Sequence, residues 1–345
     1  MASITGTSSN DIFENWQNTD RLDGGAGIDT IIINGNYANA LIDGSYVYTS
    51  FSQYFPDEYY LNQRVFSTAE NSGAPSYTFE VGIKNIEIVQ FVNGTIYLNK
   101  NDSIDEFFYA DNYKDVFAAK LDAAAHYNIS GWKEGRNPNE YFSTSGYISA
   151  NSDVRAANIN PLEHYNRSGW KEGRDPDILF DTTLYIKFNP DFSKSGLSPV
   201  EHYIQFGEKL GYRTYRAIGQ KIDSDGFDAE FYLLANPDVG KAGVDAHQHY
   251  SSFGLYEKRN PNGYFDIDQY LKKNTDIAVA KIDPLEHYNN FGWKEGRSAS
   301  WIFNTEKYLF ENPDVAAAHI NPLEHYLQFG AYEGRSNPYD DNMIM

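Results

Sequence analysis

The stretch NPLEHYNRSGWKEGR, residues 160–174, decides the organisation of most of the chain, because versions of it occur six times. Its His-Tyr pair recurs at His126, His164, His202, His249, His287 and His325, and all but one of the intervals between these positions are equal. An Asp stands eleven positions before each His, and a Tyr stands six positions before each Asp. This spacing predicts six copies of one unit across residues 104–338, about 38 residues per copy, with a nine-residue insertion near 216–226.

Each copy carries the signals of short helices. A capping residue stands four positions before the Tyr and follows an apolar residue, which predicts a first helix with a hydrophobic staple. Asn-Pro, as at Asn189 and Asn312, ends or kinks that helix. A second capping residue four positions before each His predicts another helix, and Glu or Gln at its third position predicts a capping box in five copies. A Gly nine residues after that cap, such as Gly169, is expected to end the helix.

Helices this short need burial against one another to be stable in water. The six copies therefore predict either an α-helical repeat array or a compact helical domain built from the repeated units. His164 and its five equivalents have two interpretations, a row of metal or ligand sites with the adjacent Glu, or packing residues satisfied by a neighbouring carbonyl or carboxylate. The second is favoured, because a metal site needs several ligands together and only His247 and His249 stand as a close pair of histidines.

The Glu-Gly-Arg that closes most copies has its own two interpretations. Its Arg, as in Arg174, is expected to pair with the Asp of the Asn-Pro-Asp motif in its own copy or the next. The alternative is a glycan-binding surface that uses Trp132, Trp170 and Trp293, since aromatic planes beside Arg and Glu suit sugar rings.

Residues 1–100 have a different pattern, in which β-branched and aromatic runs alternate with Gly, Asn and Ser. The predicted strands fall in residues 29–35, 44–51, 76–82 and 86–98, with a hairpin turn at Asn93-Gly94. The fold class is therefore α+β and multidomain, with a small N-terminal β domain followed by the helical repeat domain and a tail at 339–345.

The N-terminal region also carries the most specific chemical pattern. GGAGIDTII, residues 24–32, fits the nonapeptide G-G-x-G-x-D-x-U-x without a mismatch, and GTSSNDIFE stands two nonapeptide lengths earlier, at 6–14. Asp11, Asp20 and Asp29 form one series with a period of nine, and Phe13, Leu22 and Ile31 form a second.

These motifs resemble the RTX family of calcium-binding β-roll proteins, which bacteria secrete through type I machinery. The resemblance covers residues 5–98 and implies that stacked loops two nonapeptides apart share Ca²⁺, the cofactor expected here, through loop carbonyls and Asp carboxylates. The implied metal-site residues are Gly6, Ser8, Asp11, Asp20, Gly24, Gly25, Gly27 and Asp29. Only one nonapeptide is complete, because the first lacks two glycines. DSDGFD at 223–228 resembles a further calcium loop but lacks the full EF-hand spacing.

The helical repeats look like the NPDV, PLEHY and EGR units of bacterial secreted RTX-type proteins, which also occur beside some polysaccharide-related enzymes. The last six residues, DDNMIM, resemble the C-terminus of many type I substrates. Both resemblances imply an extracellular or bacterial cell-surface location.

Composition and missing motifs narrow the function. The net charge of −20 disfavours nucleic acid and anionic membranes as partners. There is no cysteine, so disulfides and thiolate chemistry are excluded. We expect no cleaved Sec signal peptide, no membrane insertion and no enzyme, since serine-hydrolase, zinc-protease and nucleotide-binding motifs are missing from the sequence.

The expected function is that of a secreted, calcium-binding structural or adhesive surface protein. Its repeats would mediate self-assembly into a surface layer or filament, or attachment to a cell surface or matrix. The alternatives are a carbohydrate-binding module that uses the Trp, Tyr and Arg of the repeats to bind a cell-surface polysaccharide and, below it, a hydrolytic enzyme.

Overall fold

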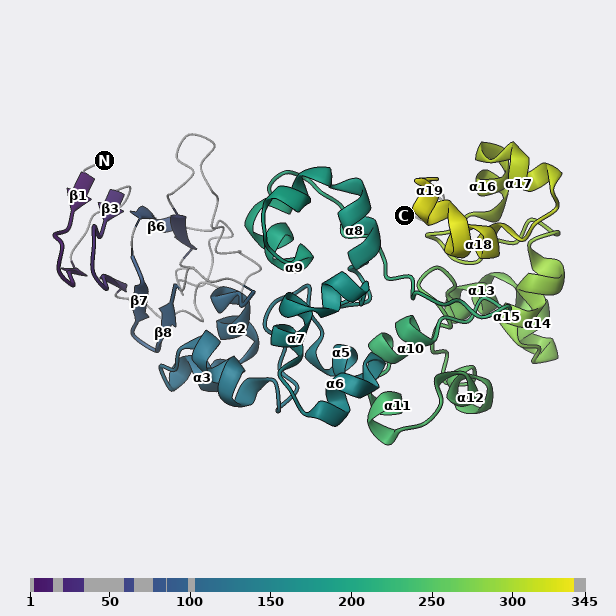
Figure 1. Cartoon of the computed structure of the whole chain (residues 1–345), viewed down its shortest axis with the longest axis horizontal. Helices are drawn as coiled ribbons and strands as arrows, with labels where there is room; N and C mark the ends of the chain where they lie inside the picture. The colour runs from purple at the N-terminus through teal and green to yellow at the C-terminus, as the bar shows by residue number, and fades with distance from the viewer. Residues whose placement is uncertain are drawn as a thin grey trace, which may run out of the picture. The chain divides into compact units, whose positions relative to one another are not determined.

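The computed structural model in Figure 1 describes residues 3–14, 21–33, 59–64, 77–84, 86–98 and 103–337. The chain divides into two compact units, Met1–Gly131 and Trp132–Met345. Strands give way to helices where the sequence pattern changes, near residue 104, but the first unit continues to Gly131. The first helical copy therefore belongs to the same compact unit as the strands.

The described part of the first unit contains two four-stranded sheets. The first sheet has the order β1 (Ser3–Thr5), β3 (Arg21–Asp23), β6 (Tyr77–Lys84) and β5 (Tyr59–Arg64). The second has the order β2 (Ile12–Phe13), β4 (Thr30–Ile33), β7 (Ile88–Phe91) and β8 (Gly94–Tyr97). The strands predicted in 29–35, 76–82 and 86–98 are confirmed, and the one predicted at 44–51 lies outside the described residues.

The parallel strand pairs repeat with the spacing of the nonapeptides. Strand β1 pairs with β3 so that Ser3 lies opposite Arg21, and β2 pairs with β4 so that Ile12 lies opposite Thr30. Both pairs have the same offset, the length of two nonapeptides. The antiparallel hairpin of β7 and β8 closes the second sheet next to Asn93-Gly94, as expected.

The core of the first unit follows the apolar series with a period of nine. Leu22 and Ile31 are fully buried, and Phe13 is nearly so. Ala110 and Phe117 of the first helical copy join the same apolar cluster. The strands and the first copy thus share one core, which explains why the compact unit extends past the strands.

Each copy opens with a seven-residue helix whose predicted cap forms. These helices are α2 (Glu106–Asn112), α5 (Thr144–Ala150), α8 (Thr182–Phe188), α10 (Ala229–Ala235), α13 (Ile267–Lys273) and α16 (Thr305–Glu311). In all six, the side chain of the capping residue accepts a hydrogen bond from the backbone N–H three residues later. Asn189 and Asn312 stand at the ends of α8 and α16, as the Asn-Pro motif predicts.

A short second helix follows in each copy. These are α3 (Lys114–Ala118), α6 (Ser152–Ala157), the 3₁₀ helix η3 (Pro190–Lys194), α11 (Pro237–Ala242), α14 (Thr275–Ala280) and α17 (Pro313–Ala317). One or two residues after the end of each of these helices, a residue has a positive φ. These residues are Lys120, Asn158, Gly196, Gly243, Lys281 and His319. A left-handed turn therefore reverses the chain at the same place in every copy.

The helix that carries the repeated His comes third in each copy. These helices are α4 (Ala123–His126), α7 (Pro161–Arg167), α9 (Pro199–His202), α12 (Ala246–His249), α15 (Pro284–His287) and α18 (Pro322–His325). All six predicted caps form. Among the described helices, however, the complete capping box is found only between Ser198 and Glu201, so the prediction of five boxes was too broad.

Gly169 and its equivalents lie at or next to the end of this helix, as predicted, except in the sixth copy, where another helix follows at once; however, they do not act as left-handed C-caps. In five copies the helix continues into a π-helical turn that ends at the Gly. These turns are η1 (Tyr127–Gly131), η4 (Tyr203–Gly207), η5 (Tyr250–Gly254), η6 (Tyr288–Gly292) and η7 (Tyr326–Gly330). The second copy has the 3₁₀ turn η2 (Gly169–Glu172) instead, and in the sixth copy the helix α19 (Ala331–Glu333) follows η7. None of the six glycines has a positive φ. A Cβ at Gly292 would collide with the hydroxyl of Tyr270, and the other five glycines face the equivalent Tyr in the same way. Glycine is needed here for close packing.

The copies of the second unit pack on more than their sequence neighbours. Helix α5 of the second copy contacts α10 and α11 of the fourth, and Arg155 donates a hydrogen bond to the Gly240 carbonyl at 2.5 Å. Tyr141 packs on Tyr203 with ring centres 4.8 Å apart, and Tyr264 packs on Tyr326 with ring centres 4.9 Å apart. In both pairs the second Tyr belongs to the copy two further along the chain. These contacts support the compact helical domain, because the copies of a simple array contact only adjacent copies. In the described part of the chain, no helix is both long and apolar enough to span a bilayer.

Candidate functional site

The two loops predicted to hold calcium lie directly on one another. The Gly6 amide donates to the Asp23 carbonyl at 2.7 Å, and the Ala26 amide donates to the Thr7 carbonyl at 3.2 Å. The Ile28 amide donates to the Asn10 side chain at 2.9 Å. Residues 6–11 and 24–29 are therefore stacked with the offset of two nonapeptides that the motif requires.

Asp29 is the most deeply buried carboxylate at these loops. It is fully buried, and its Oδ1 accepts a hydrogen bond from the Asp11 amide at 2.7 Å. Its own amide donates to Glu87 Oε2 at 2.9 Å. Its Oδ2 is buried and has no hydrogen-bond partner among the described residues. An unpaired buried carboxylate oxygen is costly, and a cation would remove that cost.

The predicted glycines shape the two loops around Asp29. Gly25 and Gly27 have φ of 90° and 139°, a conformation that favours glycine. A Cβ on Gly6 would collide with the Gly24 carbonyl oxygen and lie 2.8 Å from Asp11 Oδ2, so that glycine leaves room between two oxygen atoms.

Two of the predicted ligands contribute less. Ser8 is exposed, and Asp20 lies outside the described residues. Asp11 Oδ2 accepts hydrogen bonds from the Thr7 amide at 2.6 Å and the Thr7 hydroxyl at 2.9 Å. Asp29, Asp11 and the loop carbonyls supply oxygen atoms, which are the ligands that Ca²⁺ prefers.

The six histidines of the repeats are held by one partner of the same kind. In every copy Nδ1 of the His lies within hydrogen-bond distance of the hydroxyl of the Tyr 17 residues earlier, at 2.7–3.0 Å. That Tyr is at most 1% exposed in all copies. Burial lowers the pKa of His164, His202 and His325. The expected packing role thus has a tyrosine hydroxyl as its partner, where a carbonyl or carboxylate was predicted.

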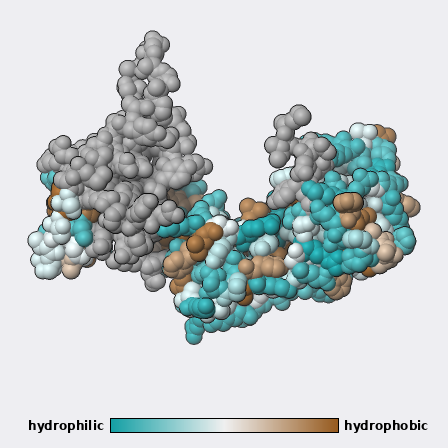
Figure 2. Space-filling model, turned by 90° about the horizontal axis from the view of Figure 1, so that it is seen from above, coloured by the Kyte–Doolittle hydropathy of each residue, from teal (hydrophilic) through white to brown (hydrophobic). Residues whose placement is uncertain are grey.

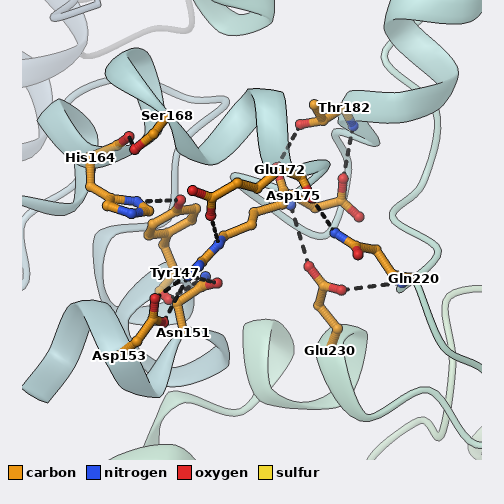
Figure 3. Close-up of polar contacts among 11 residues, drawn as sticks. Tyr147, Asn151, Asp153, His164, Ser168, Glu172, Asp175, Thr182, Gln220 and Glu230 are labelled. Atoms are coloured by element: carbon orange, nitrogen blue, oxygen red, sulfur yellow. Dashed lines mark hydrogen bonds and ion pairs between the residues drawn. The ribbon is translucent and has the colours of Figure 1, made fainter.

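The repeated Arg pairs with the Asp of its own copy. Arg174 contacts Asp153 through two nitrogens, both at 2.8 Å, and also donates to Asn151 at 2.9 Å (Figure 3). Its Nε lies 2.7 Å from Glu172 Oε2. The Arg174 hydrogen bonds lower the pKa of Asp153 to about 2. Arg259, Arg297 and Arg335 make equivalent contacts in their copies. Each clamp closes one copy upon itself.

Of the repeated Trp residues, Trp132 is buried, and Trp170 and Trp293 are half-buried. Trp132 is 8% exposed. The indole N–H groups of Trp170 and Trp293 donate to backbone carbonyls four residues earlier, at 3.1 and 3.0 Å. The following Lys lies over each ring, with Lys171 Nζ at 5.2 Å from the Trp170 ring centre. This arrangement weighs against a row of open stacking platforms for sugar rings.

A second group of candidate metal ligands lies in the insertion between the third and fourth copies. Asp223 and Asp225, from the DSDGFD stretch, lie beside His247 of α12. Sequence reasoning noted the stretch and the additional His separately and did not connect them, because their proximity depends on the path of the insertion.

Comparison of the chain with models of protein families, with curated proteins and with solved structures finds no match.

Proposed function

We propose that this chain is a secreted calcium-binding structural protein of the RTX type, whose N-terminal strands form a β-roll and whose repeats mediate self-assembly. The observation that carries the proposal is the stacked pair of loops with a buried, unpaired oxygen on Asp29. A bound Ca²⁺ would be held by Asp29, Asp11 and loop carbonyls, and it would supply the positive charge that these oxygens lack. Calcium would then couple folding of the first unit to export into calcium-rich surroundings.

The repeat region supports a structural role more than a catalytic one. Its repeated polar groups are used within the copies, by the Tyr–His pair and the Arg clamp. Exposed phenylalanines occupy the position before the packing Gly in four copies, at 47–59% exposure, and they are Phe206, Phe253, Phe291 and Phe329. Figure 2 shows hydrophobic residues as separate patches among hydrophilic ones on the visible face. Regularly repeated apolar positions suit contact with a second copy of the chain.

The calcium part is tested by Asp29→Asn in the full chain. Asn keeps an oxygen for the Asp11 amide but removes the charge, so we expect Ca²⁺ affinity to fall by more than about tenfold in calorimetric titration. Without Ca²⁺, the same variant should be at least as stable as the original, because an unpaired buried charge is lost. Asp122→Asn, which retains a helix-capping side chain in the same unit, is the matched control. Equal Ca²⁺ affinity in both variants would refute the assigned site.

The assembly part is tested by size-exclusion chromatography and negative-stain imaging with and without millimolar Ca²⁺. Ordered polymers that form only with Ca²⁺ are expected, and Phe291→Ser combined with Phe329→Ser should reduce them. A calcium-saturated monomer that binds a glycan array would instead favour the carbohydrate-binding alternative and overturn self-assembly.

A further inference from the structure

Two departures from the repeat pattern meet at one place in the second unit. The first is the insertion around residues 217–226, which interrupts the regular period of the repeat. The second is His247, because the equivalent residue is aliphatic in the five other copies, namely Ala124, Leu162, Val200, Leu285 and Leu323. Of these, Leu162, Val200, Leu285 and Leu323 are at most 4% exposed, whereas the side chain of His247 is 42% exposed. A polar residue has therefore replaced a core residue opposite the insertion.

The insertion presents two carboxylates to this imidazole. Asp223 Oδ2 lies 3.3 Å from His247 Nδ1, and Asp225 Oδ2 lies 3.0 Å from His247 Nε2. Taking one ligand atom from each residue, all three atoms lie within 4.8 Å of one another. The carboxylates are 36% and 45% exposed, so the cluster is open to ions from solution.

The loop that carries the carboxylates is fixed by backbone and side-chain hydrogen bonds. The Asp223 amide donates to the Phe227 carbonyl, and the Gly226 amide donates to the Asp223 carbonyl, both at 2.9 Å. Asn289 donates to the Asp225 carbonyl at 2.6 Å, and Asn262 donates to the Gly226 carbonyl at 2.8 Å. The carbonyls of Asp223, Asp225 and Gly226 thus already accept hydrogen bonds, and Asp225 Oδ1 accepts one from the Phe227 amide at 3.0 Å. The Oδ2 atoms of the two carboxylates are the ones that face His247.

The imidazole is also held in place. The His247 ring stacks on Phe227, with ring centres 4.6 Å apart and an angle of 14° between the planes. Phe227 is fully buried and packs on Tyr250 from the same helical segment as His247. The orientation of His247 is therefore set by the core beneath it.

Tyr250 supplies an independent sign that this part of the repeat is altered. Its hydroxyl is buried without a hydrogen-bond partner among the described residues, whereas the equivalent Tyr165 and Tyr288 contact the hydroxyls of Thr182 and Thr305 at 3.0 and 2.8 Å. The residue at the Thr position of the next copy is Ile267. Burial and the carboxylates of Asp283 and Asp225 raise the pKa of Tyr250. Asp283, outside the cluster, acts on this buried hydroxyl more strongly than Asp225 does.

We infer that Asp223, Asp225 and His247 form a second metal site, for a borderline divalent transition-metal ion such as Zn²⁺, separate from the calcium loops. An imidazole with two carboxylates favours such an ion over Ca²⁺, which prefers an all-oxygen set. One ring nitrogen and oxygens of the two carboxylates would bind the ion, and water would complete its coordination. The bound ion would link the insertion to helix α12, which is labelled in Figure 1.

The test is Zn²⁺ titration of the full chain in saturating Ca²⁺, followed by calorimetry and, with Co²⁺ as a probe, by visible absorption. The original chain should bind one Zn²⁺ at this site. His247→Leu, which restores the residue of three other copies and so should fold, is expected to weaken binding by at least about 100-fold, as should Asp225→Asn. His319→Asn, which removes an exposed His elsewhere, and Asp29→Asn should leave Zn²⁺ binding unchanged.

Two results would overturn the inference. One is that the original chain takes up no stoichiometric Zn²⁺, in which case the cluster is an ion pair between His247 and the two carboxylates. The other is that folded His247→Leu and Asp225→Asn bind Zn²⁺ as tightly as the original. Since Asp29→Asn tests the calcium loops separately, failure of one site is distinguishable from failure of the other.

Discussion

Replacing Asp175 with Asn should stabilise the second unit, and the gain should depend on pH. Asp175 is 2% exposed, and its Oδ1 accepts a hydrogen bond from the Thr182 amide at 2.8 Å. Asn137 and Asn260 hold the same position in other copies and accept the equivalent bond through their own oxygen, each at 3.0 Å. Asn at 175 therefore preserves the turn and removes a buried charge.

The charge is costly because other carboxylates surround it. Burial raises the pKa of Asp175 well above its usual value, and the carboxylates of Asp181, Glu230 and Asp228 raise it further. Burial also raises the pKa of Asp181 and Asp228 to about 7 each. Glu230 accepts hydrogen bonds from the backbone amides of Gln220 and Asp175, at 3.3 and 3.4 Å respectively. Figure 3 draws both contacts. Arg174 lies near Glu230 and is the nearby cation. The tyrosines that interact with this cluster are Tyr147, Tyr165, Tyr264, Tyr326 and Tyr332.

The magnitude follows from these values. For Asp181 and Asp228, a pKa of about 7 in the folded state against 3.8 in the unfolded state is a difference of about 3, and one pKa unit corresponds to 1.36 kcal/mol, so ionising either group costs about 4 kcal/mol. The pKa of Asp175 is raised in the same direction, with burial as the largest cause, so this cost sets the scale for it. Allowing half for the amide's poorer fit among the acceptors, Asp175→Asn should stabilise the unit by about 2 kcal/mol at pH 8. For a unit of roughly 200 residues, Trp132–Met345, this is a rise in Tm of about 4–8 °C.

The sign of the pH dependence is fixed by the direction of the shifts. The folded-state pKa values of Asp181 and Asp228 lie above their unfolded-state values. The contribution of these carboxyl groups to stability is therefore fully present below about pH 3.8 and is lost as pH rises through about 7. The original chain should lose stability across this interval, and the variant should lose less. The gain should therefore disappear near pH 4.

Calorimetric unfolding at pH 4, 6 and 8 measures this difference. Asp153→Asn is the matched control, because the Arg174 hydrogen bonds lower the Asp153 pKa to about 2, so its loss should destabilise slightly at all three pH values. A Tm gain for Asp175→Asn that is equal at pH 4 and pH 8, or a loss at pH 8, would show that the buried carboxylates do not act as described.

Two further predictions concern the backbone. Gly292→Ala should destabilise the second unit by about 3 kcal/mol in urea unfolding, because a Cβ would collide with the Tyr270 hydroxyl; a loss under about 1 kcal/mol would show that this close approach is not needed. Lys281→Gly should stabilise the second unit by about 0.5–1 kcal/mol, because φ at Lys281 is 55° and Gly243 holds the equivalent position in the preceding copy. The control is Ala278→Gly inside α14, which should destabilise the unit by about 1 kcal/mol. Equal effects of the two Gly substitutions would contradict this explanation.

Local signals predicted the helix starts well, because capping is decided within four residues. Asp181 and Asn304 cap their helices as the sequence indicates. The role of Gly292 was missed because it depends on Tyr270, on another helix. Similarly, the Arg174–Asp153 pair was expected, but the choice between its own copy and the next required the path of the chain.

The partner of His164 was within reach of the sequence and was not recognised. Tyr147 precedes His164 by 17 residues, and the five other copies have the same spacing between their Tyr and His. A constant separation between two polar aromatic residues is itself evidence that they meet, since side chains that share a hydrogen bond constrain the length of chain between them. By contrast, the unpaired oxygen of Asp29 required coordinates, because the nonapeptide pattern gives the positions of the loops and not the hydrogen bonds within them.

The six copies also act as internal controls for one another. Positions that are constant among the copies, such as Tyr270 with His287 and Gly292, are explained by one packing arrangement and need no ligand. A position that departs from the series must be explained by something outside that arrangement. His247 replaces an aliphatic residue and faces the insertion, and Asp175 stands where two other copies have Asn and faces other acids. In a chain built from repeats, chemistry specific to one copy is therefore best sought where the pattern is broken, which is why the proposed Zn²⁺ site lies at the insertion.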